Sequence, residues 1–163
     1  MNRSLESALR FINLTTSGLL AGSLGFGEAV LVPGWEEERP VRGRHDMRSA
    51  VERLKAMNYF NAIGPVALAT SVTLAVGSSR ESSVSRRLLD AVSAVGLAGV
   101  LAATVLVTVP ANRELENQPA TDYPSDRSQS LAKNWSRAHA VRTTLGIGAF
   151  LCAVASGVAP KRK

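Results

Sequence analysis

The sequence predicts an all-α protein, an integral membrane bundle of four helices in up-down order. Its apolar residues gather into four blocks, at residues 12–34, 57–78, 88–109 and 140–159. Each block is close to the roughly 20 residues that a helix needs to cross the hydrocarbon core of a bilayer. The centres of the second and third blocks carry no charged residue, whereas a soluble amphipathic helix keeps a charged face. The 163 residues then form a single membrane domain, 1–163.

The first block follows basic residues, as a signal peptide does, but its apolar stretch is too long for one. An uncleaved first helix is therefore predicted. Gly18 and Gly22 form a small-xxx-small pair in this helix, and Gly96, Gly99 and Ala103 form a comparable strip in the third block. Such strips allow the backbones of two membrane helices to approach closely. They would serve packing within the bundle and a homo-oligomer equally well.

The connections between the blocks differ in length. Residues 79–87 form a short polar connection, while the longer loops 35–56 and 110–139 lie together at the opposite membrane face. Residues 46–55 are compatible with a helix that leads into the second span, and the prolines of the last loop make part of it irregular. The two long loops either cover a pocket or are simply solvated.

The net charge of +6 comes mainly from the loops and the C-terminal tail. Basic residues that flank apolar spans usually contact anionic lipid headgroups, so we expect a lipid bilayer as partner and no nucleic acid. The N-terminal side packs its Lys and Arg residues into less chain, which favours a cytoplasmic N-terminus in a bacterial-type cytoplasmic membrane. The single cysteine, Cys152, excludes an intramolecular disulfide.

Polar residues collect where the four predicted spans reach the membrane face that carries the long loops. They are Glu28 in the first span, Asn58 and Asn61 in the second, Asn112 after the third, and Trp135, His139 and Arg142 at the start of the fourth. Polar side chains at membrane depth are costly and usually face a bundle interior or a polar cavity. The sequence therefore predicts a shared pocket at this face.

The spacing in the fourth helix supports the pocket, because Trp135, His139 and Arg142 fall on one helical stripe. Each also has a structural reading: the indole suits a headgroup belt, and the arginine can extend to lipid phosphates. Glu28 lies about one turn from the membrane edge, where an unpaired carboxylate is unfavourable. It is either paired with a cation such as Arg142, or neutral.

No metal-ligand spacing, nucleotide-binding loop or haem attachment motif is present. The sequence therefore predicts no organic cofactor. If a metal is bound, His139 and Glu28 are its expected ligands, with His45 and Asp46 as further oxygen and nitrogen donors.

Two segments resemble a known family. TVPANRELE at 108–116 and NWSRAHAVRTTLG at 134–146 resemble the anthrone oxygenase-like family of small four-helix membrane proteins, and the resemblance extends over nearly the whole chain. It implies a membrane-embedded oxygenase of secondary metabolism that acts on aromatic polyketides, in some members oxidising an anthrone to an anthraquinone.

The residues allow a mechanism for such a reaction. His139 or Glu28 would remove a benzylic proton, and Arg142, with Asn112 or Asn58, would stabilise the resulting oxygen anion. Molecular oxygen is the expected cosubstrate and would react with the activated carbon without an obligatory organic cofactor.

Asn58, Asn61 and Trp135 are the predicted contacts to the small apolar substrate. The alternative is a non-enzymatic carrier, scaffold or complex subunit in which the polar cluster is structural. A transport role predicts polar residues along the interior toward the other face. The second and third spans offer only small hydroxyls there, which favours a pocket closed at depth: Thr70, Ser71, Thr73 and Ser93.

Overall fold

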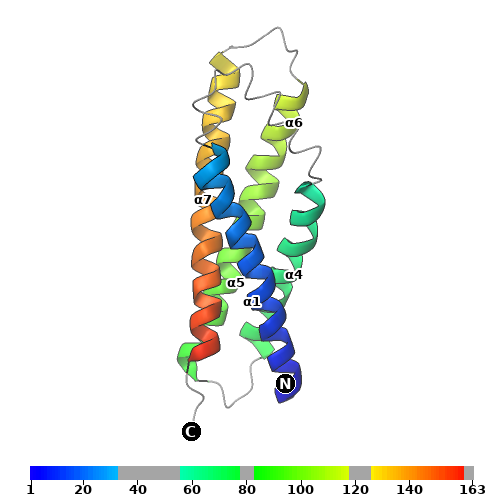
Figure 1. Cartoon of the computed structure of the whole chain (residues 1–163), viewed down its shortest axis with the longest axis vertical. Helices are drawn as coiled ribbons and strands as arrows, with labels where there is room; N and C mark the ends of the chain where they lie inside the picture. The colour runs from blue at the N-terminus through cyan, green and yellow to red at the C-terminus, as the bar shows by residue number, and fades with distance from the viewer. Residues whose placement is uncertain (33–55, 78–82, 118–125, 160–163) are drawn as a thin grey trace.

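The computed structural model describes residues 1–32, 56–77, 83–117 and 126–159, and these form helices that run alternately up and down (Figure 1). The elements are α1 (Arg3–Phe26), η1 (Gly27–Leu31), α4 (Ala56–Gly77), α5 (Val84–Ala103), η2 (Thr104–Thr108), α6 (Val109–Asn117) and α7 (Asp126–Val158). The segments η1 and η2 are π-helical turns that continue α1 and α5 without a break. The predicted all-α, four-helix up-down bundle is confirmed.

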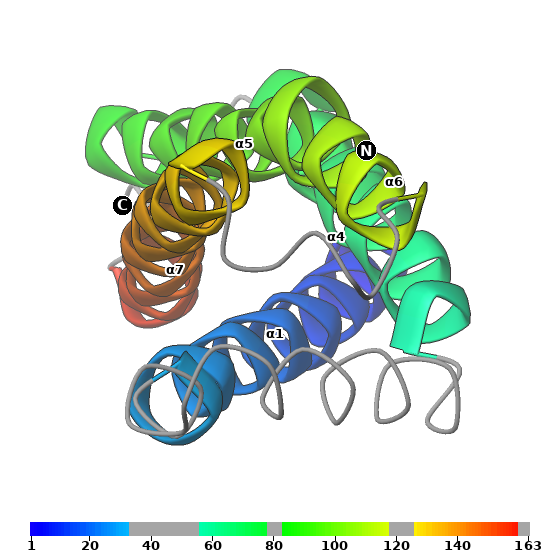
Figure 2. The same ribbon diagram turned by 90° about the horizontal axis from the view of Figure 1, so that it is seen from above.

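Around the bundle, each helix packs on two neighbours. α5 lies between α4 and α7, and α1 closes the arrangement by packing on both α4 and α7 (Figure 2). Because the helices alternate in direction, the start of α1 and the end of α7 lie at the same end (Figure 1). We call this the terminal end, and the end that holds η1, η2 and α6 the site end.

Three described helices are long and apolar enough to cross a membrane, within Tyr59–Gly77, Val84–Glu114 and Lys133–Val158. Large apolar side chains such as Phe11, Val95 and Leu106 are exposed on the outside of the bundle, as a lipid-facing surface requires. α1 is comparably long, but its Asn and hydroxyl residues make it less apolar than these three. The chain is an integral membrane bundle.

The helices extend further than the predicted spans. Residues 110–117 and 126–139, expected to belong to a loop, are helical, so the last connection is much shorter than predicted. The helix passes Pro110, which has no N–H to donate four residues back, immediately after the wide turn η2, where the N–H of Val109 bonds to the carbonyl of Thr104. The predicted helix at 46–55 lies outside the described residues.

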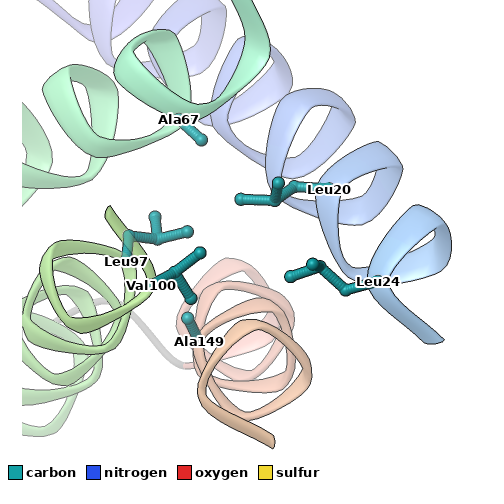
Figure 3. Close-up of a cluster of buried hydrophobic side chains, with 6 residues drawn as sticks. All are labelled: Leu20, Leu24, Ala67, Leu97, Val100 and Ala149. Atoms are coloured by element: carbon teal, nitrogen blue, oxygen red, sulfur yellow. The ribbon is translucent and has the colours of Figure 1, made fainter. Parts of the chain in front are cut away.

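An apolar layer fills the middle of the bundle. Its buried side chains come from all four long helices (Figure 3): Leu20, Leu24, Ala67, Leu97, Val100 and Ala149. Lipid tails are as apolar as leucine, so this layer stabilises the bundle through close packing rather than through removal of apolar surface from water.

Glycines permit the closest helix approaches. A Cβ at Gly99 would lie 2.9 Å from a leucine of α7, and one at Gly96 would lie 3.0 Å from an alanine of α7, so the predicted strip in α5 packs on that helix. Gly18 also faces α7, where an added Cβ would lie 3.1 Å from Phe150. Gly22 is exposed and no described atom lies within 4 Å of the place of its Cβ. The predicted Gly18–Gly22 contact strip is therefore wrong at Gly22 within this chain.

A buried ion network closes the terminal end. Arg10 of α1 donates to both carboxylate oxygens of Asp90 at 3.2 and 3.1 Å, to Glu6 at 3.1 Å and to Ser156 at 2.9 Å. Arg86 donates to the carbonyl oxygen of Ser156 at 2.9 Å and lies 3.8 Å from Glu6. These five residues, the terminal network, join α1, α5 and α7.

Above the terminal network lies a second polar layer, in which the side chain of Asn13 accepts a hydrogen bond from Ser71 at 2.8 Å, and Ser71 lies 3.2 Å from Ser93. The expectation of small hydroxyls alone beyond the site was therefore incomplete, because it overlooked the charges and Asn13. The apolar layer separates these polar residues from the site end.

Candidate functional site

Arg142 and His139 are both buried on the first half of α7, at the site end. Nη2 of Arg142 donates a hydrogen bond to Nδ1 of His139 at 2.8 Å. A guanidinium has only donors, so Nδ1 must supply a lone pair. The imidazole is therefore neutral in this arrangement, and its proton lies on Nε2.

Trp135 fixes the plane of the His139 ring. The two rings stack with centroids 5.2 Å apart and an angle of 5° between their planes. Trp135, His139 and Arg142 thus lie on one stripe of α7, as their spacing indicated. The stripe faces other helices rather than lipid, because His139 and Arg142 are buried.

Glu28 reaches the same place from η1. Its Oε2 lies 3.8 Å from Nε2 of His139, and its side chain is half-buried. Gly27 allows this approach, since a Cβ there would lie only 2.8 Å from Nε2 of His139. The sequence analysis named Arg142 as an example of a cation partner for Glu28, but the structure brings His139 near Glu28 instead.

Arg142 is held on its other side by η2, which the sequence reasoning did not single out. Nη1 donates to the hydroxyl of Thr108 at 2.9 Å and to that of Thr104 at 3.4 Å. None of the ion pairs within the described ranges includes Arg142. A buried guanidinium is thus bound by neutral acceptors alone among the described side chains.

Both π-helical turns of the described chain contact α7 at this end. In η1 the N–H of Val32 bonds five residues back to Gly27, and in η2 the N–H of Val109 bonds to Thr104. Such wide turns are rare in proteins, and those that occur are often found at functional sites. One turn presents Glu28 to His139, and the other presents Thr104 and Thr108 to Arg142.

Several buried polar atoms here have no hydrogen-bond partner among the described residues. They are Glu28 Oε2, Asn112 Oδ1, His139 Nε2 and Arg142 Nε. Buried polar groups in proteins are nearly always hydrogen-bonded, so such a concentration needs an explanation. Two of these atoms are acceptors and two are donors in the tautomer described above. A ligand with oxygen atoms and at least one acidic hydrogen would satisfy both kinds.

Helix α4 contributes fewer described side chains to the site than its sequence indicated. Asn61 is exposed on α4, and none of the interactions that join His139, Arg142 and Glu28 in the described structure includes it. The hydroxyl of Tyr59 lies 3.0 Å from the hydroxyl of Ser23 in the last turn of α1. The start of α4 is therefore level with that turn and does not extend along the bundle as far as η1. Asn58 belongs to α4, but its side chain lies outside what is described.

No cluster of three or more His, Cys, Asp and Glu side chains suited to a metal ion occurs within the described ranges. His139 and Glu28 form a pair, while His45 and Asp46 lie outside those ranges. A metal on this pair would need further ligands from water, substrate or the remaining chain.

Comparison with known proteins adds one finding. The model of a family described as anthrone oxygenase matches residues 54–152, which is more than half of the chain and includes α4 to α7 through most of their length. No curated protein and no solved structure matches the chain.

Proposed function

The chain belongs to the anthrone oxygenase family, and from this we propose that it is a membrane-embedded oxygenase that acts on a small apolar aromatic substrate of the anthrone type. The observation that carries the proposal is the group of buried polar atoms on Glu28, Asn112, His139 and Arg142 that have no hydrogen-bond partner among the described residues. A flat aromatic molecule with oxygens at one edge suits a place where lipid-embedded helices end in polar groups.

Arg142 is proposed to bind the substrate oxygen that becomes negative. Its guanidinium is buried and is matched by no carboxylate among the described ion pairs. Its Nε has no hydrogen-bond partner within the described part of the chain. A buried cation of this kind stabilises a developing oxyanion more strongly than it would in water. His139 would add a second donor through its Nε2–H, and Asn112 would accept from a substrate hydroxyl.

Glu28 is the better candidate for the base. In the described arrangement Nδ1 of His139 accepts from Arg142 and Nε2 carries the proton, so neither nitrogen has a free lone pair. The carboxylate of Glu28 has such lone pairs, and its buried Oε2 has no hydrogen-bond partner among the residues that the structure describes. Of the two bases that the sequence left open, this geometry favours Glu28, with His139 orienting the substrate.

The proposed reaction converts a benzylic CH2 into a carbonyl. Glu28 takes one proton, and the resulting anion gives up electrons to molecular oxygen as a carbon–oxygen bond forms. The peroxide collects the proton and then loses water with the second benzylic hydrogen, which leaves a quinone. Overall, one O2 is consumed, one of its oxygens enters the product and the other leaves as water. The scheme requires no organic cofactor, and a metal remains compatible with it.

The test uses purified protein in lipid nanodiscs with an unsubstituted anthrone as the probe, and follows oxygen uptake and quinone formation above the rate without protein. Arg142→Ala should lower turnover about 100-fold, the loss typical of a removed oxyanion donor. Arg137→Ala is the matched control, because Arg137 is exposed on the same helix. Equal turnover of the Arg142→Ala variant and wild type would overturn the proposed role.

Glu28→Gln separates the base from its neighbours. The amide keeps the size of the side chain but cannot accept the proton, so turnover should fall by about 100-fold or more while substrate affinity stays near the wild-type value. Substrate binding is measured separately, without oxygen. If His139→Ala abolishes turnover and Glu28→Gln leaves it unchanged, the assignment of the base is wrong. Metal analysis of the same preparations distinguishes a metal-dependent oxidase from the cofactor-free scheme.

A further inference from the structure

We propose that Thr108, assisted by Thr104, is a positioning residue that fixes Arg142 and thereby the tautomer of His139. This inference rests on the proposed function, because it assigns the two threonines a part in the same site. Neither hydroxyl is needed to bind substrate in that proposal. Both nevertheless lie on the guanidinium, at 2.9 and 3.4 Å from Nη1.

Both hydroxyls direct their hydrogens to backbone carbonyls of α5, which leaves their oxygen atoms as acceptors for an arginine. Thr104 donates its own hydrogen to the carbonyl oxygen of Val100 at 2.7 Å. Thr108 lies 3.5 Å from the carbonyl oxygen of Ala103, five residues back, and donates in that direction. With their hydrogens directed to the backbone, the oxygen lone pairs are left for Nη1 of Arg142.

The guanidinium transmits this restraint because it is planar. Holding Nη1 on η2 determines where Nη2 lies, and Nη2 donates to Nδ1 of His139 at 2.8 Å. Nδ1 then remains an acceptor and Nε2 remains protonated, directed to Glu28 at 3.8 Å. Without the threonines, the long arginine side chain would have other rotamers available, and His139 would be free to exchange its tautomers.

The test compares Thr108→Val, which keeps the shape and removes the acceptor, with Thr108→Ser, which keeps the hydroxyl. Thr144→Val is the matched control, since the exposed Thr144 of α7 donates to the carbonyl of Ala140 in its own helix and, among the described residues, makes no hydrogen bond to the site. The first readout is 15N NMR of the His139 ring in a His45→Gln background, which leaves one histidine in the chain. We expect the Nε2–H tautomer in the parent, Thr108→Ser and Thr144→Val proteins, and a mixture in Thr108→Val.

The second readout is turnover of anthrone. Thr108→Val should lower kcat about tenfold, the effect of one lost hydrogen bond to a charged group, with a smaller change in KM. Thr108→Ser should restore kcat to within about twofold of the parent. An unchanged ring tautomer in Thr108→Val overturns the positioning role while leaving the proposed function intact. If Thr108→Val changes the ring tautomer but the wild-type protein does not turn over anthrone, the result counts against the proposed function and leaves the positioning role intact.

Discussion

Gly27 determines how closely the end of α1 approaches the imidazole of His139. The ring cannot move aside freely, because Trp135 stacks on one face and Arg142 binds Nδ1. A methyl group at residue 27 would therefore collide with the ring, at 2.8 Å from Nε2. The glycine is needed for space at this position.

Gly27→Ala should consequently lower both stability and turnover. Overpacking of this kind costs about 1–3 kcal/mol, which would appear as a lower midpoint of thermal unfolding in detergent. Gly22→Ala is the control, because no described atom lies within 4 Å of its Cβ position. That variant should unfold at the wild-type temperature or above it. A Gly27→Ala protein with full stability and activity would show that the site tolerates a wider separation of α1 and α7.

For single residues, the sequence pointed to the charged and aromatic side chains of the site end and missed the threonines that bind one of them. Trp135, His139 and Arg142 were recognisable by helical spacing, and Glu28 by its place in an apolar run. Thr104 and Thr108 were not, because threonines in membrane helices commonly bond to their own backbone. A usable signal was the spacing to proline, since each π turn ends two residues before one, Pro33 or Pro110 in the sequence.

At the level of the helices, the C-terminal end of α7 is capped by a side chain of α5, that of Arg86. Arg86 donates to the carbonyls of Ser156 at 2.9 Å and Gly157 at 3.2 Å. The last carbonyls of a helix have no partner in the helix itself. A buried guanidinium satisfies two of them and adds an attraction to the negative end of the helix dipole.

Arg86→Ala should therefore destabilise the bundle, by about 3 kcal/mol, because it leaves the carbonyls of Ser156 and Gly157 at the helix end without their donor. Arg87→Ala provides the comparison, as the neighbouring arginine is exposed. The two variants are compared by thermal unfolding in the same detergent. If both unfold at the wild-type temperature, the contacts of Arg86 contribute nothing measurable to the stability of the bundle.

The apolar blocks predicted the number and order of the helices, but not their lengths. Helices α6 and α7 extend beyond the apolar residues, where hydropathy no longer distinguishes helix from loop. Asp90 lies one helical turn after Arg86 in α5, in a largely apolar run. A carboxylate in such a run indicates a buried cation as its partner. Its partner Arg10 resembled an ordinary basic residue flanking a span, so the pair could be identified only once α1 and α5 were placed side by side.

For the whole molecule, the up-down order predicts that both chain ends lie on one side of the membrane if all four helices cross it. Three helices are apolar enough by themselves, so α1 decides the outcome. Its Arg10 is neutralised inside the bundle by Asp90 and Glu6, which lowers the cost of placing it at membrane depth.

We therefore expect reporters fused to the two ends to give the same side, and a reporter inserted at residues 118–125 to give the opposite one. Protease protection in sealed vesicles provides the measurement. Chain ends on opposite sides would mean that α1 lies along the membrane surface and that only three helices cross.

The apolar layer between the two polar ends has an energetic consequence for the cell. Leucine, valine and alanine side chains have no titratable group, so the proton that Glu28 takes from a substrate should stay at the site end until the peroxide collects it. Oxidation would then move no charge across the bilayer, and turnover should not depend on the electrical potential. An ionophore that collapses this potential in sealed vesicles should leave the rate unchanged.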